Sequence, residues 1–203
     1  MDRLNAALAA LQAPAVAIPI CAVTVGVILL LRRPWTALYV ALMPLINWSF
    51  AAVPTLPIPP EFGGGAFQPL AIVTGLVLVV RDFAQREVKH WVLAAMLIGL
   101  ALSTLTSWIT IVLASGAAFL ISELVDWAVY TFSNRPLSER IMISSAVSAP
   151  LDQVVFIYLA AMVVPGIFAW GTVITGIVSK LAGAYVVSRI VAAQERRAAM
   201  NPA

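Results

Sequence analysis

Ser122-Glu-Leu-Val-Asp-Trp-Ala-Val-Tyr130 places two carboxylates inside an otherwise apolar segment of the chain. Glu123 and Asp126 are three residues apart, so a helix would bring them to one face. An ionised carboxylate in the hydrocarbon core of a bilayer costs about 3 kcal/mol even on the most lenient insertion scale. If this segment crosses a membrane, the two acids therefore need water, an ionic partner or a ligand.

The composition of the chain is that of a multi-pass membrane protein. Hydrophobic residues make up 62% of the sequence and charged residues 10%, and the mean hydropathy is +1.00, whereas a soluble domain carries about 25% charged residues. The sequence therefore predicts an all-α integral membrane protein. Cys21 is the only cysteine and His90 the only histidine, so we expect no metal and no cofactor. The net charge of +3 gives no indication of nucleic-acid binding.

Seven apolar segments are candidates to cross a bilayer, which takes about 20 helical residues. They are residues 14–31, 35–53, 66–80, 91–113, 117–132, 141–164 and 167–191. The last six form a predicted six-helix core over residues 35–191. The first lies in the N-terminal segment 1–34 and is predicted to be an additional span; because it is short, a tilted or interfacial helix is the alternative. Residues 192–203 form a basic tail.

The segments between the spans differ in charge, and this difference predicts the orientation. Residues 54–65 contain four prolines and three glycines and predict an ordered loop. Residues 81–90 are the most charged loop, and tight turns are predicted at Ser115-Gly116 and Pro165-Gly166. If the spans alternate, one side receives Arg32, Arg33, Arg81, Arg86, Lys89, Arg135, Arg140, Arg189, Arg196 and Arg197. The positive-inside rule makes that side and the C-terminus cytoplasmic, and we expect a bacterial inner membrane.

Two later spans carry a second group of polar residues. Asp152 and Gln153 occupy the middle of one span, and Phe156 follows Asp152 by four residues on the same face. Lys180 lies midway along the last span. A carboxylate, an amide and an aromatic ring on one face suit a flat, hydrogen-bonding heterocycle. The alternative is an ion pair between Asp152 and Lys180 that satisfies both charges, and the two interpretations can coexist.

The remaining polar candidates also have a structural alternative. Glu123 and Asp126 are candidates for ligand binding, but they could instead snorkel toward a helix end or pair with arginines of adjacent loops. Asn47 either binds a substrate or joins two helices by a hydrogen bond, which is common in membranes. Gln68 lies at the mouth of its span, next to the loop 54–65.

Four runs of sequence carry a family resemblance. They are Val80-Arg-Asp-Phe-Ala-Gln85, Ser115-Gly-Ala-Ala-Phe-Leu-Ile-Ser-Glu-Leu-Val-Asp-Trp-Ala-Val-Tyr130, Asp152-Gln-Val-Val-Phe156 and Gly176-Ile-Val-Ser-Lys180. Over residues 35–191 the chain resembles the VUT family, which comprises vitamin-uptake-like or queuosine-precursor transporters. The resemblance implies a six-span transporter core related to the substrate-binding subunits of energy-coupling-factor importers, and 7-deazaguanine bases as the substrate class.

Two features depart from that family's pattern. The segment 14–31 is additional to the family core, and Ser179 precedes Lys180 where the family usually has glycine. Gly176 and Gly183 still flank the lysine, so we expect the backbone there to approach a neighbouring helix closely.

The chemistry of the candidate residues agrees with a guanine-like ligand. Such a base presents an N–H and an amino group side by side, and a carboxylate accepts both in a bidentate pair. Glu123 or Asp152 is the candidate for this role. Asn47 and Gln153 are candidates for the carbonyl and ring nitrogens, and Phe156 or Trp127 for stacking.

Three further functions are weighed against a transporter that works alone or as a homodimer. The first is a substrate-binding subunit that needs an ATPase module, docked on the small-residue face Ala37-x-x-x-Ala41; the chain has no phosphate-binding glycine loop of its own. The second is a structural membrane protein, which would not explain acids on several spans, and the third is an intramembrane enzyme. An aspartyl-protease pair of Asp126 and Asp152 is disfavoured, because Lys180 would suppress the shared-proton chemistry. We therefore expect that the protein is not an enzyme. The expected partners are a purine-like small molecule, the lipid bilayer, and either a second copy of the chain or an ATPase module.

Overall fold

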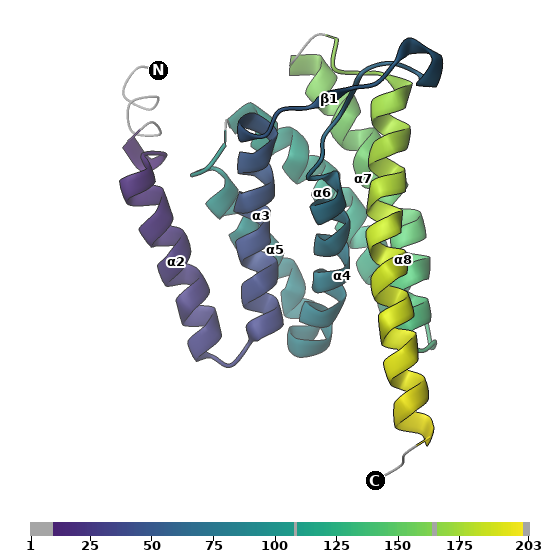
Figure 1. Cartoon of the computed structure of the whole chain (residues 1–203). Helices are drawn as coiled ribbons and strands as arrows, with labels where there is room; N and C mark the ends of the chain where they lie inside the picture. Colours follow the sequence, from purple (N-terminus) through teal and green to yellow (C-terminus); the bar gives the residue numbers. More distant parts are fainter. Residues whose placement is uncertain (1–9, 108, 164–165, 201–203) are drawn as a thin grey trace. The chain divides into compact units, whose positions relative to one another are not determined.

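The computed structural model describes residues 10–107, 109–163 and 166–200. Its main elements are helices, shown in Figure 1: α2 (Pro14–Leu30), α3 (Pro34–Ala52), α4 (Ala71–Val88), α5 (Val92–Ser103), α6 (Ile109–Phe132), α7 (Leu137–Val163) and α8 (Trp170–Met200). Among the described residues, α3 to α8 supply the six helices of the predicted core, and α2 is the additional N-terminal helix. The prediction of an all-α membrane protein is confirmed. The first nine residues of the segment 1–34 and Pro165 of the predicted turn lie outside the described residues.

Three of the described helices are long and apolar enough to cross a membrane by length and composition. The spans lie at Val112–Val129 in α6, Leu137–Met162 in α7 and Trp170–Arg197 in α8. α2 is apolar along its 17 residues but is shorter. Large apolar side chains of α8 point outward, with Val178, Val186 and Ile190 more than half exposed. Such an outward-facing hydrophobic surface suits contact with lipid.

The predicted boundaries around α4 are wrong. The segment 66–80 does not begin as a helix, because Ala66–Phe67 form strand β2 and the helix begins at Ala71. The predicted loop 81–90 is instead helical as far as Val88. Arg81 donates a hydrogen bond to the Gln85 side chain one turn later, at 3.3 Å. No proline or glycine interrupts the run, so charge alone does not end the helix.

The predicted span 91–113 is broken, and the predicted turn at Ser115-Gly116 is wrong. α5 ends at Ser103, α6 begins at Ile109, and α6 continues through both turn residues. The hydroxyls of Ser103 and Thr104 bond to backbone carbonyls of their own helix, at 2.9 and 2.7 Å. Thr106 donates instead to the Pro44 carbonyl at 3.0 Å. Such side-chain bonds compete with the helical ladder and favour a break among hydroxylated residues.

The described chain divides into two compact units, each with its own packing. Unit 1 comprises Met1–Pro54 and Val80–Gly116. In it α2 and α3 form a helical hairpin (Figure 1). The Arg33 guanidinium donates to the Glu87 carbonyl at 2.6 Å, and the Thr36 hydroxyl donates to the Glu87 carboxylate at 2.6 Å. The α2–α3 turn therefore lies at the same end of unit 1 as the C-terminus of α4.

Unit 2 comprises Thr55–Val79 and Ala117–Ala203, and α7 and α8 lie side by side in it (Figure 1). The segment between α3 and α4, here called the strap, contains strand β1 (Leu56–Pro57), a 3₁₀ turn (Pro60–Phe62) and β2, which pairs antiparallel with β1. The strap docks on the start of α8: the Gly171 N–H donates to the Gly63 carbonyl at 3.2 Å. A side chain at Gly171 would overlap the Gly64 carbonyl oxygen. The prediction of an ordered loop over residues 54–65 is confirmed.

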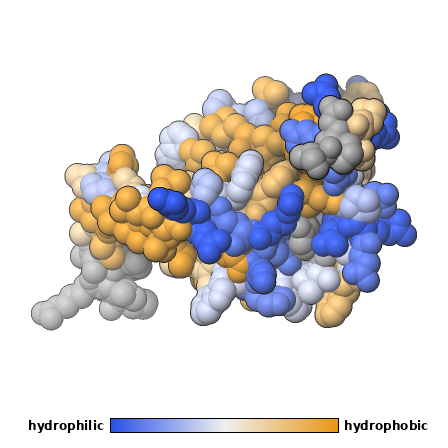
Figure 2. Space-filling model, turned by 90° about the horizontal axis from the view of Figure 1, so that it is seen from below, coloured by the Kyte–Doolittle hydropathy of each residue, from blue (hydrophilic) through white to orange (hydrophobic). Residues whose placement is uncertain are grey.

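Basic residues gather at one end of each unit. Figure 2 views the end where α8 finishes and shows hydrophilic side chains on this face with hydrophobic ones around them. In unit 1, Arg32 and Arg33 follow the end of α2, and in unit 2, Arg196 and Arg197 lie near the end of α8. α8 extends to Met200, so most of the predicted tail 192–203 continues the last helix.

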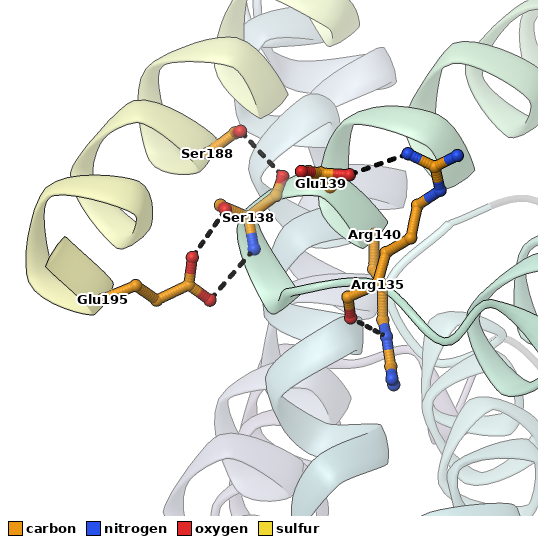
Figure 3. Close-up of polar contacts among 6 residues, drawn as sticks. All are labelled: Arg135, Ser138, Glu139, Arg140, Ser188 and Glu195. Atoms are coloured by element: carbon orange, nitrogen blue, oxygen red, sulfur yellow. Dashed lines mark hydrogen bonds and ion pairs between the residues drawn. The ribbon is translucent and has the colours of Figure 1, made fainter. Parts of the chain in front are cut away.

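The extension of α8 caps the start of α7 (Figure 3). The Glu195 carboxylate accepts a hydrogen bond from the Ser138 hydroxyl at 2.6 Å and from the Ser138 N–H at 3.4 Å. The Ser188 hydroxyl donates to the Ser138 carbonyl at 2.8 Å. The first N–H groups of a helix lack intrahelical partners. Glu195, from the end of α8, therefore supplies the hydrogen-bond acceptor that a neighbouring side chain normally supplies at a helix start.

We expect Glu195→Ala to lower the free energy of unfolding by about 1–2 kcal/mol, the cost of losing a helix cap. Thermal unfolding in detergent measures this. Glu139→Ala is the matched control, because within the described residues Glu139 forms only an exposed ion pair with Arg135, at 3.0 Å, and an exposed pair contributes at most about 1 kcal/mol. Equal destabilisation by both substitutions would contradict the capping role.

Candidate functional site

Unit 2 holds most of the predicted site residues. α6 supplies two acids, α7 supplies a carboxylate, an amide and an aromatic ring, and α8 supplies a cation. All of these side chains are buried in the chain: Glu123, Asp126, Asp152, Gln153, Phe156 and Lys180. Gln68 is half-buried and lies in the strap, directly after β2. Asn47 belongs to unit 1.

Asp152 and Lys180 form an ion pair between α7 and α8. Their side chains are 6% and 4% exposed. The structural alternative given for these two residues is thereby confirmed. Pairing compensates a charge that would otherwise be expensive to bury in an apolar surrounding.

Gln153 lies next to this pair and is fixed by backbone groups of α8. Its amide Nε2 donates to the Thr172 carbonyl at 3.3 Å. A side chain at Gly176 would overlap the Gln153 amide, so the glycine makes room for the glutamine. Thr172 also binds the strap, because its hydroxyl accepts a hydrogen bond from the Ala66 N–H at 2.9 Å. The strap and the amide of the candidate site are therefore tied to the same residue.

The backbone near Lys180 also approaches another helix closely, as the flanking glycines predicted, but through a different glycine. A Cβ atom at Gly75 on α4 would lie 2.6 Å from the Lys180 carbonyl oxygen and 2.7 Å from its Cα. Gly183 has only ordinary contacts with this part of α4. Gly75 is thus the residue that lets α4 and α8 meet at the lysine.

Glu123 and Asp126 are 0% and 1% exposed. Snorkelling toward a helix end would leave the carboxylates exposed, so that alternative is wrong for both residues. They are one turn apart on α6, as the spacing predicted. Trp127 is half-buried and meets Phe132 edge-on, with ring centroids 6.3 Å apart.

Asn47 joins two helices of unit 1 through its amide nitrogen and leaves its amide oxygen as an additional acceptor. Its amide Nδ2 donates to the Met43 carbonyl and to the Ser103 hydroxyl, both at 3.1 Å. Its Oδ1 is buried and has no hydrogen-bond partner among the described residues. Because the Met43 carbonyl can only accept, the amide orientation is fixed with Nδ2 toward it. The predicted helix–helix bond is confirmed, and the oxygen retains the capacity to accept from a ligand.

The sequence predicts an ion pair of Arg81 and Asp82 in a loop. The two residues do form this pair, but they lie on α4 in unit 1, with both side chains 0% exposed and their charged atoms 2.9 Å apart. Their place directly after an apolar run was the available signal, together with the family run that begins at Val80. On the predicted small-residue face, Ala37 is 1% exposed.

Comparison with known protein families identifies a membrane transporter family, which agrees with the apolar helices and the buried polar residues described above. The model of the family described as "Putative vitamin uptake transporter" matches residues 65–193. This range includes α4 to most of α8 and therefore the candidate residues of unit 2, whereas α2, α3 and Asn47 lie outside it. No curated protein and no solved structure matches the chain.

Proposed function

We propose that this chain, which belongs to the vitamin uptake transporter family, imports a queuosine precursor, a 7-deazaguanine base, across a bacterial inner membrane. The substrate would bind in the polar site formed by the buried residues of unit 2. The basic ends of the helices support a cytoplasmic C-terminus, since positive residues favour the cytoplasmic side.

The observation that carries the proposal is the complete burial of Glu123 on a membrane-spanning helix. A carboxylate there can accept the ring N–H and the exocyclic amino group of a guanine-like base in a bidentate pair. Asp152 is the other candidate for this role, and Lys180 binds its carboxylate. We assign the base edge to Glu123, with Asp126 one turn away, because Glu123 is the most deeply buried of the three acids, at 0% exposed.

The neighbouring residues of α7 support the same ligand class. Gln153 is held by the Thr172 carbonyl, and its own carbonyl oxygen can accept from the base. Phe156, one turn beyond Asp152, is 7% exposed and offers a ring for stacking. Gln68 is the further proposed contact in unit 2, whereas Asn47 belongs to unit 1. A site of this kind rejects analogues that leave its buried polar atoms unpaired.

The test is equilibrium binding to purified protein of 7-cyano-7-deazaguanine, 7-aminomethyl-7-deazaguanine, guanine and biotin. We expect saturable binding of a deazaguanine that Glu123→Gln weakens by about 10- to 100-fold, because a hydrogen bond to a charged group contributes about 1.5–3 kcal/mol. Glu139→Gln, on the exposed part of α7, is the control and should bind as the wild type does.

Two outcomes would contradict the proposal. Tight binding of biotin with no binding of any deazaguanine would reject the substrate class. Deazaguanine binding that is unchanged in Glu123→Gln would reject the assigned carboxylate. If the wild type binds but takes up the base in proteoliposomes only when an ATPase module is added, the chain is a substrate-binding subunit instead.

A further inference from the structure

α7 carries two buried serines in line with Asp152. Ser145 and Ser148 precede the aspartate by seven and four residues, so all three side chains occupy one face of the helix. With a rise of 1.5 Å per residue, the serines lie about 10 Å and 6 Å from Asp152 along the axis. They lie toward the basic end of α7, where Glu195 binds Ser138 (Figure 3).

These two hydroxyls are buried, but nothing in the described part of the chain binds them. Ser145 is 1% exposed and Ser148 is 0% exposed, and their Oγ atoms have no hydrogen-bond partner among the described residues. Three other buried serines, Ser144, Ser122 and Ser103, donate to a carbonyl within their own helix. Ser145 and Ser148, on the face that continues from Asp152, differ from these three.

Burying a hydroxyl without a partner costs free energy, whereas alanine would fit the same space without that cost. A buried polar atom left without a protein partner is generally explained by water, an ion or a ligand. A hydroxyl is uncharged and both donates and accepts, so its natural partner is an uncharged amide, carbonyl or ring nitrogen.

We infer that Ser145 and Ser148 line the solute path on the basic side of Asp152, where they hydrogen-bond an uncharged group of the transported molecule. The inference rests on the proposed transport function and adds a second set of contacts to the site of unit 2. Beyond these serines the same face reaches Ser138, whose hydroxyl and N–H are both taken by Glu195. The two hydroxyls thus lie between the charged pair and the capped end of α7.

The first test does not depend on the identity of the substrate. In a Cys21→Ser background, which removes the only cysteine, Ser144→Cys, Ser145→Cys and Ser148→Cys are treated in membranes with a small water-soluble methanethiosulfonate. We expect the reagent to label the Ser145→Cys and Ser148→Cys variants and to leave Ser144→Cys unlabelled. Ser144 is the matched control because it is equally buried and adjacent but bonded to its own helix. Equal labelling of all three variants, or of none, would overturn the inference.

The second test measures binding of 7-cyano-7-deazaguanine to alanine variants. Ser145→Ala and Ser148→Ala should each weaken binding by about threefold to tenfold, as expected for one neutral hydrogen bond, while Ser144→Ala should not. Their melting temperatures without the base should not fall, because no protein hydrogen bond is lost. Unchanged affinity in both variants would overturn the inference. If the wild type binds no deazaguanine, the proposed substrate fails and the labelling experiment alone decides the role of the serines.

Discussion

Lys180→Met is expected to lower the free energy of unfolding by about 3–5 kcal/mol, because it leaves the Asp152 carboxylate buried without its cation. The aspartate is 6% exposed and cannot reach water without a change in the packing of α7 against α8. Asp152→Asn should destabilise the protein comparably, since it leaves the lysine uncompensated. Unfolding by denaturant titration in mixed micelles measures both effects.

The double variant Asp152→Asn/Lys180→Met tests whether the loss of stability in each single variant comes from the charge left without its partner. Replacing both members of a buried ion pair with uncharged groups is often neutral, so we expect the double variant to recover most of the stability that each single variant loses. Arg135→Met is the control, because it removes an exposed pair with side chains 61% and 51% exposed, and it should cost at most about 1 kcal/mol. A double variant less stable than both single variants would contradict the compensation argument.

Hydropathy predicted that the helices exist, but it did not predict where they end. The charged run after Val80 looked like a loop, yet α4 continues through it, because Arg81 and Asp82 neutralise each other inside the chain. The hydroxylated run from Ser103 was predicted to continue the helix of the span 91–113. Instead the helix breaks there, where the hydroxyls form hydrogen bonds with backbone carbonyls. In both places the decisive partners are contacts that only the folded chain reveals.

In the candidate site, too, the sequence predicted some features and not others. The spacing of Glu123 and Asp126 predicted a shared helix face, and the opposite charges of Asp152 and Lys180 predicted their pairing. Burial and hydrogen-bond partners depend on packing, so the sequence could not distinguish Ser144, which is hydrogen-bonded, from its neighbour Ser145, whose hydroxyl has no partner in the described part of the chain. Nor does any local pattern at Gly75 indicate that the backbone of Lys180 lies against it.

Gly75→Ala is expected to destabilise the protein by up to about 3 kcal/mol, although alanine is favoured over glycine in a helix by about 1 kcal/mol. The new Cβ would lie 2.6 Å from the Lys180 carbonyl oxygen, and backbone atoms cannot rotate away as a side chain can. Relief requires α4 and α8 to separate. Gly26→Ala is the control, since no described residue lies within 4 Å of a Cβ there, and it should be neutral or stabilising.

If separation of α4 from α8 also displaces Lys180 from Asp152, the two sites are coupled. The cost of Gly75→Ala should then be smaller in the Asp152→Asn/Lys180→Met background than in the wild type, because residues that share a contact show non-additive effects. The same unfolding titration on the four proteins of this cycle measures the difference. If the changes in the free energy of unfolding are strictly additive, α8 adjusts without moving the lysine. If Gly75→Ala is as stable as the wild type, the close approach of the two backbones is not needed for the fold.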